Sequence, residues 1–174
     1  MIDPFLQAVG VHTEERAIRE SLLSALGRNK TYRDGPDDGI RIAFRTAWAT
    51  LIRDESRTYA QPVSDSQHCE IIQRISDTLS STFGELLIDG RLRYGTSQKA
   101  LNLYLKYLWR LEIITATPPH CPVDRQVLTA GGIDGTWTKC DSEKQYMEWI
   151  GMLRVKAKPL CLAEWEYGIW MPSK

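Results

Sequence analysis

Lys99 and Asp124 are the two side chains whose types and settings best fit a reaction centre. Lys99 follows Gly95 at the start of an apolar helical pattern, and Asp124 follows Pro122 at the expected start of another helix. An amine can act as a nucleophile, and a carboxylate can accept a proton or stabilise positive charge. At two facing helix starts they could form an active site. The alternative is an exposed first-turn lysine and a capping aspartate worth about 1 kcal/mol.

The elements that must position this pair are predicted to be helical. Apolar residues recur at helical spacing through most of the chain, with no alternating strand pattern of useful length. Residues 84–94 could be a short helix or a strand. We therefore expect an all-α fold, with 1–174 as a single helical domain or two small lobes around a groove. The expected helices cover 13–27, 38–51, 64–82, 96–111, 124–131, 142–158 (or from 138) and 162–170. Their expected N-caps are Thr13, Ser64 in a capping box with Gln67, Thr96 or Ser97, Asp124, and Thr138 or Ser142.

The bulk composition is that of an ordinary globular protein. The chain has 174 residues, 43% apolar and 25% charged, with a formal net charge of zero. No apolar stretch approaches the roughly 20 residues of a membrane helix, and no signal peptide is evident. The four cysteines form no Cys-x-x-Cys pair. We therefore expect a cytoplasmic protein with free thiols and no membrane partner.

A metal site is disfavoured by the spacing of the histidines and cysteines. His68-Cys69 and His120-Cys121 invite a zinc interpretation together with the two later cysteines. Adjacent residues rarely both bind one tetrahedral ion, and structural zinc sites show closer ligand pairs. We therefore expect no metal and no cofactor, with the cysteines as small apolar residues.

Basic residues are concentrated in one window despite the neutral total. Residues 91–110 contain five Lys or Arg and no acid, and a second basic cluster occupies 154–158. The backbone amides after Gly95, at a helix N-terminus, would also suit a phosphate group. This combination favours a nucleic-acid partner. The alternative is a solvated charged face.

The run GTSQKALN at 95–102 resembles the hairpin and second helix of the helix-hairpin-helix DNA glycosylases, the superfamily of endonuclease III. The run PVD at 122–124 is similar to the family segment whose aspartate starts a helix facing the hairpin lysine. Ser97 takes the place of the second hairpin glycine, and Lys99 and Asp124 are a few residues further apart than in the family. The resemblance implies a helix-hairpin-helix-like turn at 91–111, beside the groove.

The family resemblance also implies an activity on DNA bases, in repair or in base modification. A glycosylase extrudes the base from the helix, and Asp124 would stabilise the oxocarbenium character that develops on the sugar. Lys99 would form a Schiff base with the sugar if a lyase step follows, helped by desolvation and by nearby arginines. Some phage-associated relatives instead modify thymine-derived bases. The expected nucleic-acid contacts are Arg91, Arg93, Gly95, Ser97, Gln98, Asn102, His120 and Trp137, with Trp137 exposed for base stacking.

Two other functions remain open at this point. The chain could be a non-catalytic nucleic-acid-binding domain on the same fold. It could also be an all-helical protein–protein adaptor that uses its Trp-rich C-terminal region.

Overall fold

The computed structural model describes residues 3–27 and 29–171, and this part of the chain is helical without a named strand. The all-α prediction is confirmed. An antiparallel bridge between Tyr32 and Leu87 joins two loops. The α-helices are α1 Pro4–Val9, α2 Glu14–Leu26, α3 Asp38–Ser56, α4 Asp65–Phe83, α5 Tyr94–Arg110, α6 Arg125–Ala130, α7 Glu143–Ala157 and α8 Leu162–Trp170. The short 3-10 helices are η1 Arg57–Ala60, η2 Ile88–Gly90 and η3 Trp137–Lys139.

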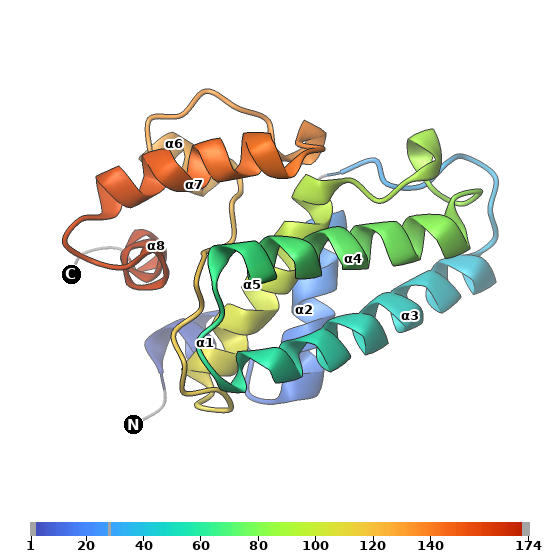
Figure 1. Ribbon diagram of the computed structural model, residues 1–174. Coiled ribbons are helices and arrows are strands. Elements are labelled where there is room, and N and C mark those ends of the chain that lie inside the picture. Colours follow the sequence, from blue (N-terminus) through green and yellow to red (C-terminus); the bar gives the residue numbers. More distant parts are fainter. Residues whose placement is uncertain (1–2, 28, 172–174) are drawn as a thin grey trace.

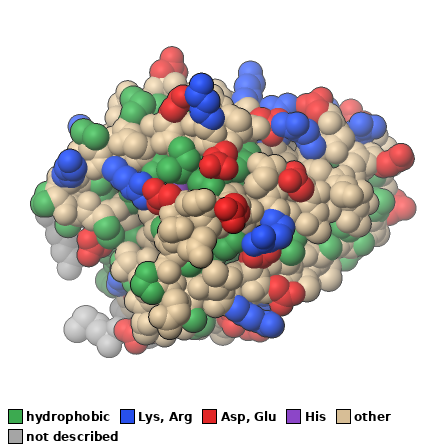
Figure 2. All heavy atoms as spheres, in the orientation of Figure 1, with side chains coloured by type: hydrophobic (Ala, Val, Ile, Leu, Met, Phe, Trp, Pro, Cys, Tyr) green, Lys and Arg blue, Asp and Glu red, His purple; other side chains and the backbone are tan. Residues whose placement is uncertain are grey.

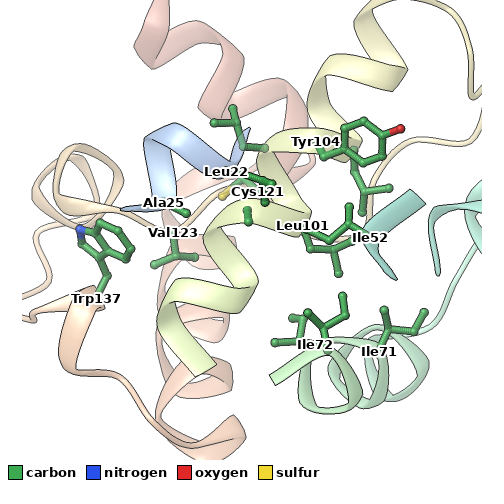
Figure 3. Packing of buried hydrophobic residues seen from close by; sticks show 14 of the residues in the cluster. Leu22, Ala25, Ile52, Ile71, Ile72, Leu101, Tyr104, Cys121, Val123 and Trp137 are labelled. Carbon is green, nitrogen blue, oxygen red and sulfur yellow. The ribbon is translucent and has the colours of Figure 1, made fainter. Parts of the chain in front are cut away.

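Helix α5 is the centre of the molecule. It packs against α2, α4 and η3, and every residue from Tyr94 to Leu108 is buried. In Figure 1, α3 and α4 lie side by side over α2 and α5, while α6, α7 and α8 form a second group. Figure 3 shows Leu101 and Tyr104 of α5 among isoleucines of α3 and α4. A helix buried on all sides must also bury its polar residues, which therefore need partners.

Several helix starts follow the predicted capping residues. Thr13, Ser64, Asp124 and Ser142 each accept a backbone hydrogen bond from their helix. At Ser64 the backbone amide in turn donates to the Gln67 side-chain oxygen, which completes the predicted capping box. These local interactions fix where α2, α4, α6 and α7 begin.

The start of α5 differs from the prediction. The helix begins at Tyr94 with Arg93 as its N-cap, so neither Thr96 nor Ser97 is the cap, and 91–111 contains one long helix instead of a hairpin. Gly95 is needed for packing, since a Cβ there would overlap the backbone oxygen of Trp137. The glycine therefore allows η3 to approach the helix closely.

The segment between α4 and α5 is an irregular connection tied to α4. Ser76 donates to the carbonyl of Leu92, and Ser80 accepts from the Leu92 amide at 2.9 Å. The short helix or strand considered for 84–94 is the single 3-10 turn η2. These bonds hold the chain as it enters α5.

The surface carries mixed charge. Figure 2 shows Lys and Arg side chains interspersed with Asp and Glu over the visible face. None of the helices formed by residues 3–27 and 29–171 has the length and apolar character needed to cross a bilayer.

Candidate functional site: the Lys99–Asp124 pocket

Lys99 and Asp124 contact each other as an ion pair. Lys99 lies in the second turn of α5 and is only 5% exposed. Asp124 is the N-cap of α6, and its Oδ1 accepts a hydrogen bond from the Val127 amide at 3.1 Å. Oδ2 contacts the Lys99 ammonium. One carboxylate therefore caps a helix and faces the lysine at the same time.

The ion pair lines a pocket of about 180 Å³. Its walls come from α2, α5, α6, η3 and α8. The ring centroid of Trp137 lies 5.9 Å from the Lys99 Nζ. The volume is below the roughly 300–1,000 Å³ of sites for drug-sized ligands, so the pocket suits a small group or a single ring system. The other lining residues are Ser24 of α2, Arg125 and Gln126 of α6, and Trp170 of α8.

Gln98 joins the segment before Asp124 to α5. Its amide Nε2 donates to the carbonyl of Val123 at 2.6 Å, and its Oε1 accepts from the Val123 amide at 3.2 Å. The residue next to Lys99 is thus bonded to the residue next to Asp124. The hydrogen bonds between Gln98 and Val123 therefore hold the backbone next to both members of the ion pair.

A buried hydrogen-bond network continues from Gln98 of α5 to α7 and α4. Asn102 donates to Gln98 Oε1 and to the Tyr146 hydroxyl, each at 3.0 Å. The Tyr146 hydroxyl lies 2.8 Å from Nδ1 of His120, whose Nε2 lies 3.0 Å from Asp65. The network therefore links the pocket to the N-terminus of α4.

Charge and burial set the protonation of this network. Two hydrogen bonds from Arg154, at 2.6 and 2.7 Å, hold the pKa of Asp65 well below its usual range. Burial lowers the pKa of His120 to about 4 despite the neighbouring Asp65. Burial also raises the pKa of Tyr146 well above its usual value. At neutral pH the network therefore consists of the charged Asp65–Arg154 pair and the neutral side chains of His120 and Tyr146.

Most of the predicted nucleic-acid contacts are buried. Gly95, Ser97, Gln98 and Asn102 lie inside α5, and the Ser97 hydroxyl donates to the carbonyl of Ile72 at 3.1 Å. Their side chains serve the protein interior and do not form an exposed hairpin. These four residues therefore have no exposed surface through which to make the predicted contact with nucleic acid.

The remaining predicted contacts occupy three different settings. His120 is buried within the network. Trp137 is also buried, so the prediction of its exposure is wrong, although its side chain lines the pocket. Arg91 and Arg93 reach the surface, but they form ion pairs with Asp141 and Asp89. Neither arginine lines the pocket, so neither adds its charge beside Lys99.

The basic window is not a continuous positive face. Lys106 is buried against Glu166, and Arg110 is paired with Asp3. The helix N-terminus is also occupied, because the Gly95 amide donates to the Cys140 carbonyl at 2.9 Å. The basic side chains of this window thus bind different acidic partners around α5. The amide expected to bind a phosphate at Gly95 instead binds a carbonyl of the protein itself.

Sequence reasoning missed Asp65, Tyr146 and Arg154, whose partners are distant in the chain. Gln98 and Asn102 carried a usable signal, since residues four apart share one helix face. Two amide side chains on the same face as buried apolar residues indicate a buried polar network.

Comparison of the chain with protein-family models, with curated proteins and with solved structures gave no match.

Proposed function

We propose that this protein is a DNA-directed enzyme acting on a base, with Lys99 and Asp124 as its reacting groups. The observation that carries the proposal is the contact between the two side chains inside one pocket. Removing two charges from water is costly, and a buried ion pair is often no more stabilising than an apolar pair. Charged pairs held in clefts are therefore candidates for functional sites.

The chemistry available to this pair is base release through a covalent sugar intermediate. Lys99 would pass a proton to Asp124, and the neutral amine would attack C1′ of the sugar. The base would leave with the electron pair of the glycosidic bond and take up the proton held by Asp124. The sugar ring would then open as one proton moves from the Lys99 nitrogen to the ring oxygen, which gives a Schiff base on Lys99. The carboxylate that Asp124 regains in this way would stabilise the positive charge of the amine adduct and of the Schiff base.

The pocket walls support a planar ligand attached to phosphates. Trp137 and Trp170 both line the pocket, and base–aromatic stacking contributes roughly 1–3 kcal/mol per base. Arg125 at the pocket and Lys139 in η3 are exposed, and neither is ion-paired within the described part of the chain. Such cations suit the phosphates that flank an extruded base.

The order of motifs in the sequence supports the same proposal. The helix-hairpin-helix glycosylases, which the runs at 95–102 and 122–124 resemble, pair a lysine with a helix-starting aspartate. The buried start of α5 means that DNA would be held by other surfaces than a hairpin. Base modification, in which a nucleophile replaces a leaving group on the base, would use the same pocket.

The decisive experiment is borohydride trapping on a panel of oligonucleotides with damaged or modified bases, in single and double strands. A reduced Schiff base would appear as a covalent protein–DNA adduct, with Lys99 identified by peptide mass spectrometry. Released or altered bases are measured in the same reactions by chromatography. We expect Lys99→Ala to abolish the adduct and Asp124→Asn to reduce it by at least roughly a hundredfold.

Matched controls come from exposed residues outside the pocket. Lys144→Ala and Asp134→Asn remove the same kinds of charge without touching the ion pair, and both should retain full activity. If Lys99→Ala and Asp124→Asn retain every DNA-dependent activity, the enzymatic proposal is wrong. DNA binding that weakens with salt but is never followed by chemistry would instead identify a non-catalytic binding domain.

A protein–protein adaptor is the second candidate, supported by exposed apolar residues near the C-terminal end of α7. Val155 is 71% exposed, and Met152 and Leu160 are about half exposed. Exposed apolar groups of this kind can mark interaction surfaces. Absence of any salt-dependent DNA binding, combined with self-association that Val155→Ser abolishes in sedimentation experiments, would favour this candidate.

A further inference from the structure

The amide of Gln98 forms two hydrogen bonds with one residue of the turn before α6. Its nitrogen donates to the Val123 carbonyl at 2.6 Å, and its oxygen accepts from the Val123 amide at 3.2 Å. The pairing resembles the two-bond exchange between opposite residues of an antiparallel ladder. Two bonds to one residue fix its orientation as well as its distance from α5.

This pairing bears directly on the reacting groups. Gln98 immediately precedes Lys99, and Val123 immediately precedes Asp124, with the same separation of 25 residues. The Asp124 carboxylate therefore depends on where Val123 is held. A misplacement of about 1 Å in a reacting group can reduce a rate about a hundredfold.

The orientation of the Gln98 amide is itself determined by its neighbours. Its oxygen accepts from both Asn102 and Val123, so a flipped amide would place its NH₂ group against two donors. Asn102 is held in turn by the Tyr146 hydroxyl at 3.0 Å. All of these side chains are buried, so water cannot replace the hydrogen bonds that a flipped amide would lose.

We propose that Gln98 is a positioning residue that holds the Asp124 carboxylate against Lys99, with Asn102 and Tyr146 fixing the orientation of its amide. The catalytic consequence rests on the function proposed above for Lys99 and Asp124. The geometric claim does not need that function. The carboxylate contacts the Lys99 amine, and displacement of the turn would leave that amine open to reagents.

Reductive methylation of the purified protein reads this contact directly. Formaldehyde reacts with neutral amines, and dimethylamine–borane reduces the product to a methylamine that peptide mass spectrometry quantifies. The ratio of Lys99 to exposed Lys144 methylation is followed across pH in the wild type and in Asp124→Asn. Asparagine is also a good N-cap, so α6 is retained. We expect the Lys99 ratio at neutral pH to rise roughly tenfold in Asp124→Asn.

The test variant is Gln98→Met, which keeps a side chain of similar length and removes both bonds to Val123. We expect it to raise the Lys99 ratio toward the Asp124→Asn value and to shift the pH profile in the same direction. Gln98→Glu keeps an acceptor for the Val123 amide but loses the donor, so its ratio should be intermediate. The exposed residue Gln145 supplies the control variant, Gln145→Ala, with an unchanged ratio.

A purely structural amide would give a different result. Gln98→Met would then lower the unfolding midpoint while the Lys99 ratio and its pH profile stay at wild-type values, and the proposal would be overturned. An unchanged ratio in Asp124→Asn would overturn it as well. If Gln98→Met does not fold, Tyr146→Phe replaces it, with an expected rise of roughly two- to threefold; no rise would overturn the proposal. Because no step uses DNA, these outcomes are independent of the trapping experiment.

Discussion

The imidazole rings of His68 and His120 meet edge to face inside the core, with their centroids 4.5 Å apart. Nδ1 of His68 lies 2.6 Å from the Tyr59 hydroxyl, while its Nε2 is buried without a hydrogen-bond partner among the described residues. Burial lowers the pKa of His68 well below its usual value and that of His120 to about 4. Two neighbouring histidines are therefore neutral in the folded protein at neutral pH.

Stability should fall as the pH drops from about 6.5 toward 4. In this window the unfolded chain binds protons on both histidines and the folded protein does not, so the free energy of unfolding rises with pH. Each histidine contributes a slope of up to about 1.4 kcal/mol per pH unit. Urea unfolding measured at several values between about pH 5 and about pH 7.5 tests the sign and size of this slope.

Histidine variants identify the groups responsible for this slope. His68→Gln should reduce the slope of unfolding free energy against pH by the equivalent of about one proton, and His120→Gln should do the same. His12 is exposed, so His12→Gln is the matched control and should leave the slope unchanged. Stability independent of pH across this window would contradict the assignment.

Removing one partner of the Lys106–Glu166 pair should be far more damaging than removing both. The ammonium lies 2.8 Å from the carboxylate and 4.0 Å from the centre of the Phe5 ring, in the interior. Lys106→Met leaves an unpaired buried carboxylate and should cost about 3–5 kcal/mol. The double variant Lys106→Met/Glu166→Met should recover most of this loss, as measured by chemical unfolding.

An exposed ion pair provides the comparison for the variants of Lys106 and Glu166. Lys30 and Asp34 interact at 3.4 Å on the surface, where such pairs contribute little. Lys30→Met should change stability by less than about 0.5 kcal/mol. If Lys106→Met is equally mild, the interior pair is not formed in solution.

Two glycine-to-alanine changes should have opposite effects. A Cβ at Gly95 would overlap the Trp137 carbonyl, so Gly95→Ala should cost about 3 kcal/mol and displace the pocket wall. Gly151 lies in α7, where an added Cβ would meet no neighbouring atom within 4 Å, so Gly151→Ala should stabilise by about 0.5–1 kcal/mol. Thermal unfolding distinguishes the two, and a neutral Gly95→Ala would show that η3 does not pack against α5.

The helices could be predicted because their signals are local. Apolar spacing and the caps at Thr13, Ser64 and Asp124 depend on residues within one or two turns. The starting residue of α5 could not be predicted this way, because its first amides are satisfied by Cys140 and Asp141 from a distant loop. Local patterns do not encode partners that tertiary packing supplies.

The pairing of Lys99 with Asp124 was accessible only as a hypothesis from the order of the motifs. The burial of charged residues was not, because α5 shows an apolar stripe that suggests one solvated face. Packing on all sides places Lys106 in the core, beside a glutamate 60 residues later. The spacing of apolar residues in a central helix is similar to that in a surface helix, so the sequence of α5 alone does not show that other helices cover it on all sides.

The position of Asp3 has a consequence for biosynthesis. This residue caps α1 and bonds to Arg110 and to the Tyr167 hydroxyl, 107 and 164 residues further along the chain. At roughly 5–20 residues per second, the ribosome needs roughly 10–30 s to supply the later partner. The final contacts of Asp3 can therefore form only after Tyr167 has been synthesised, so α1 completes its docking after the helices between these two residues have been made.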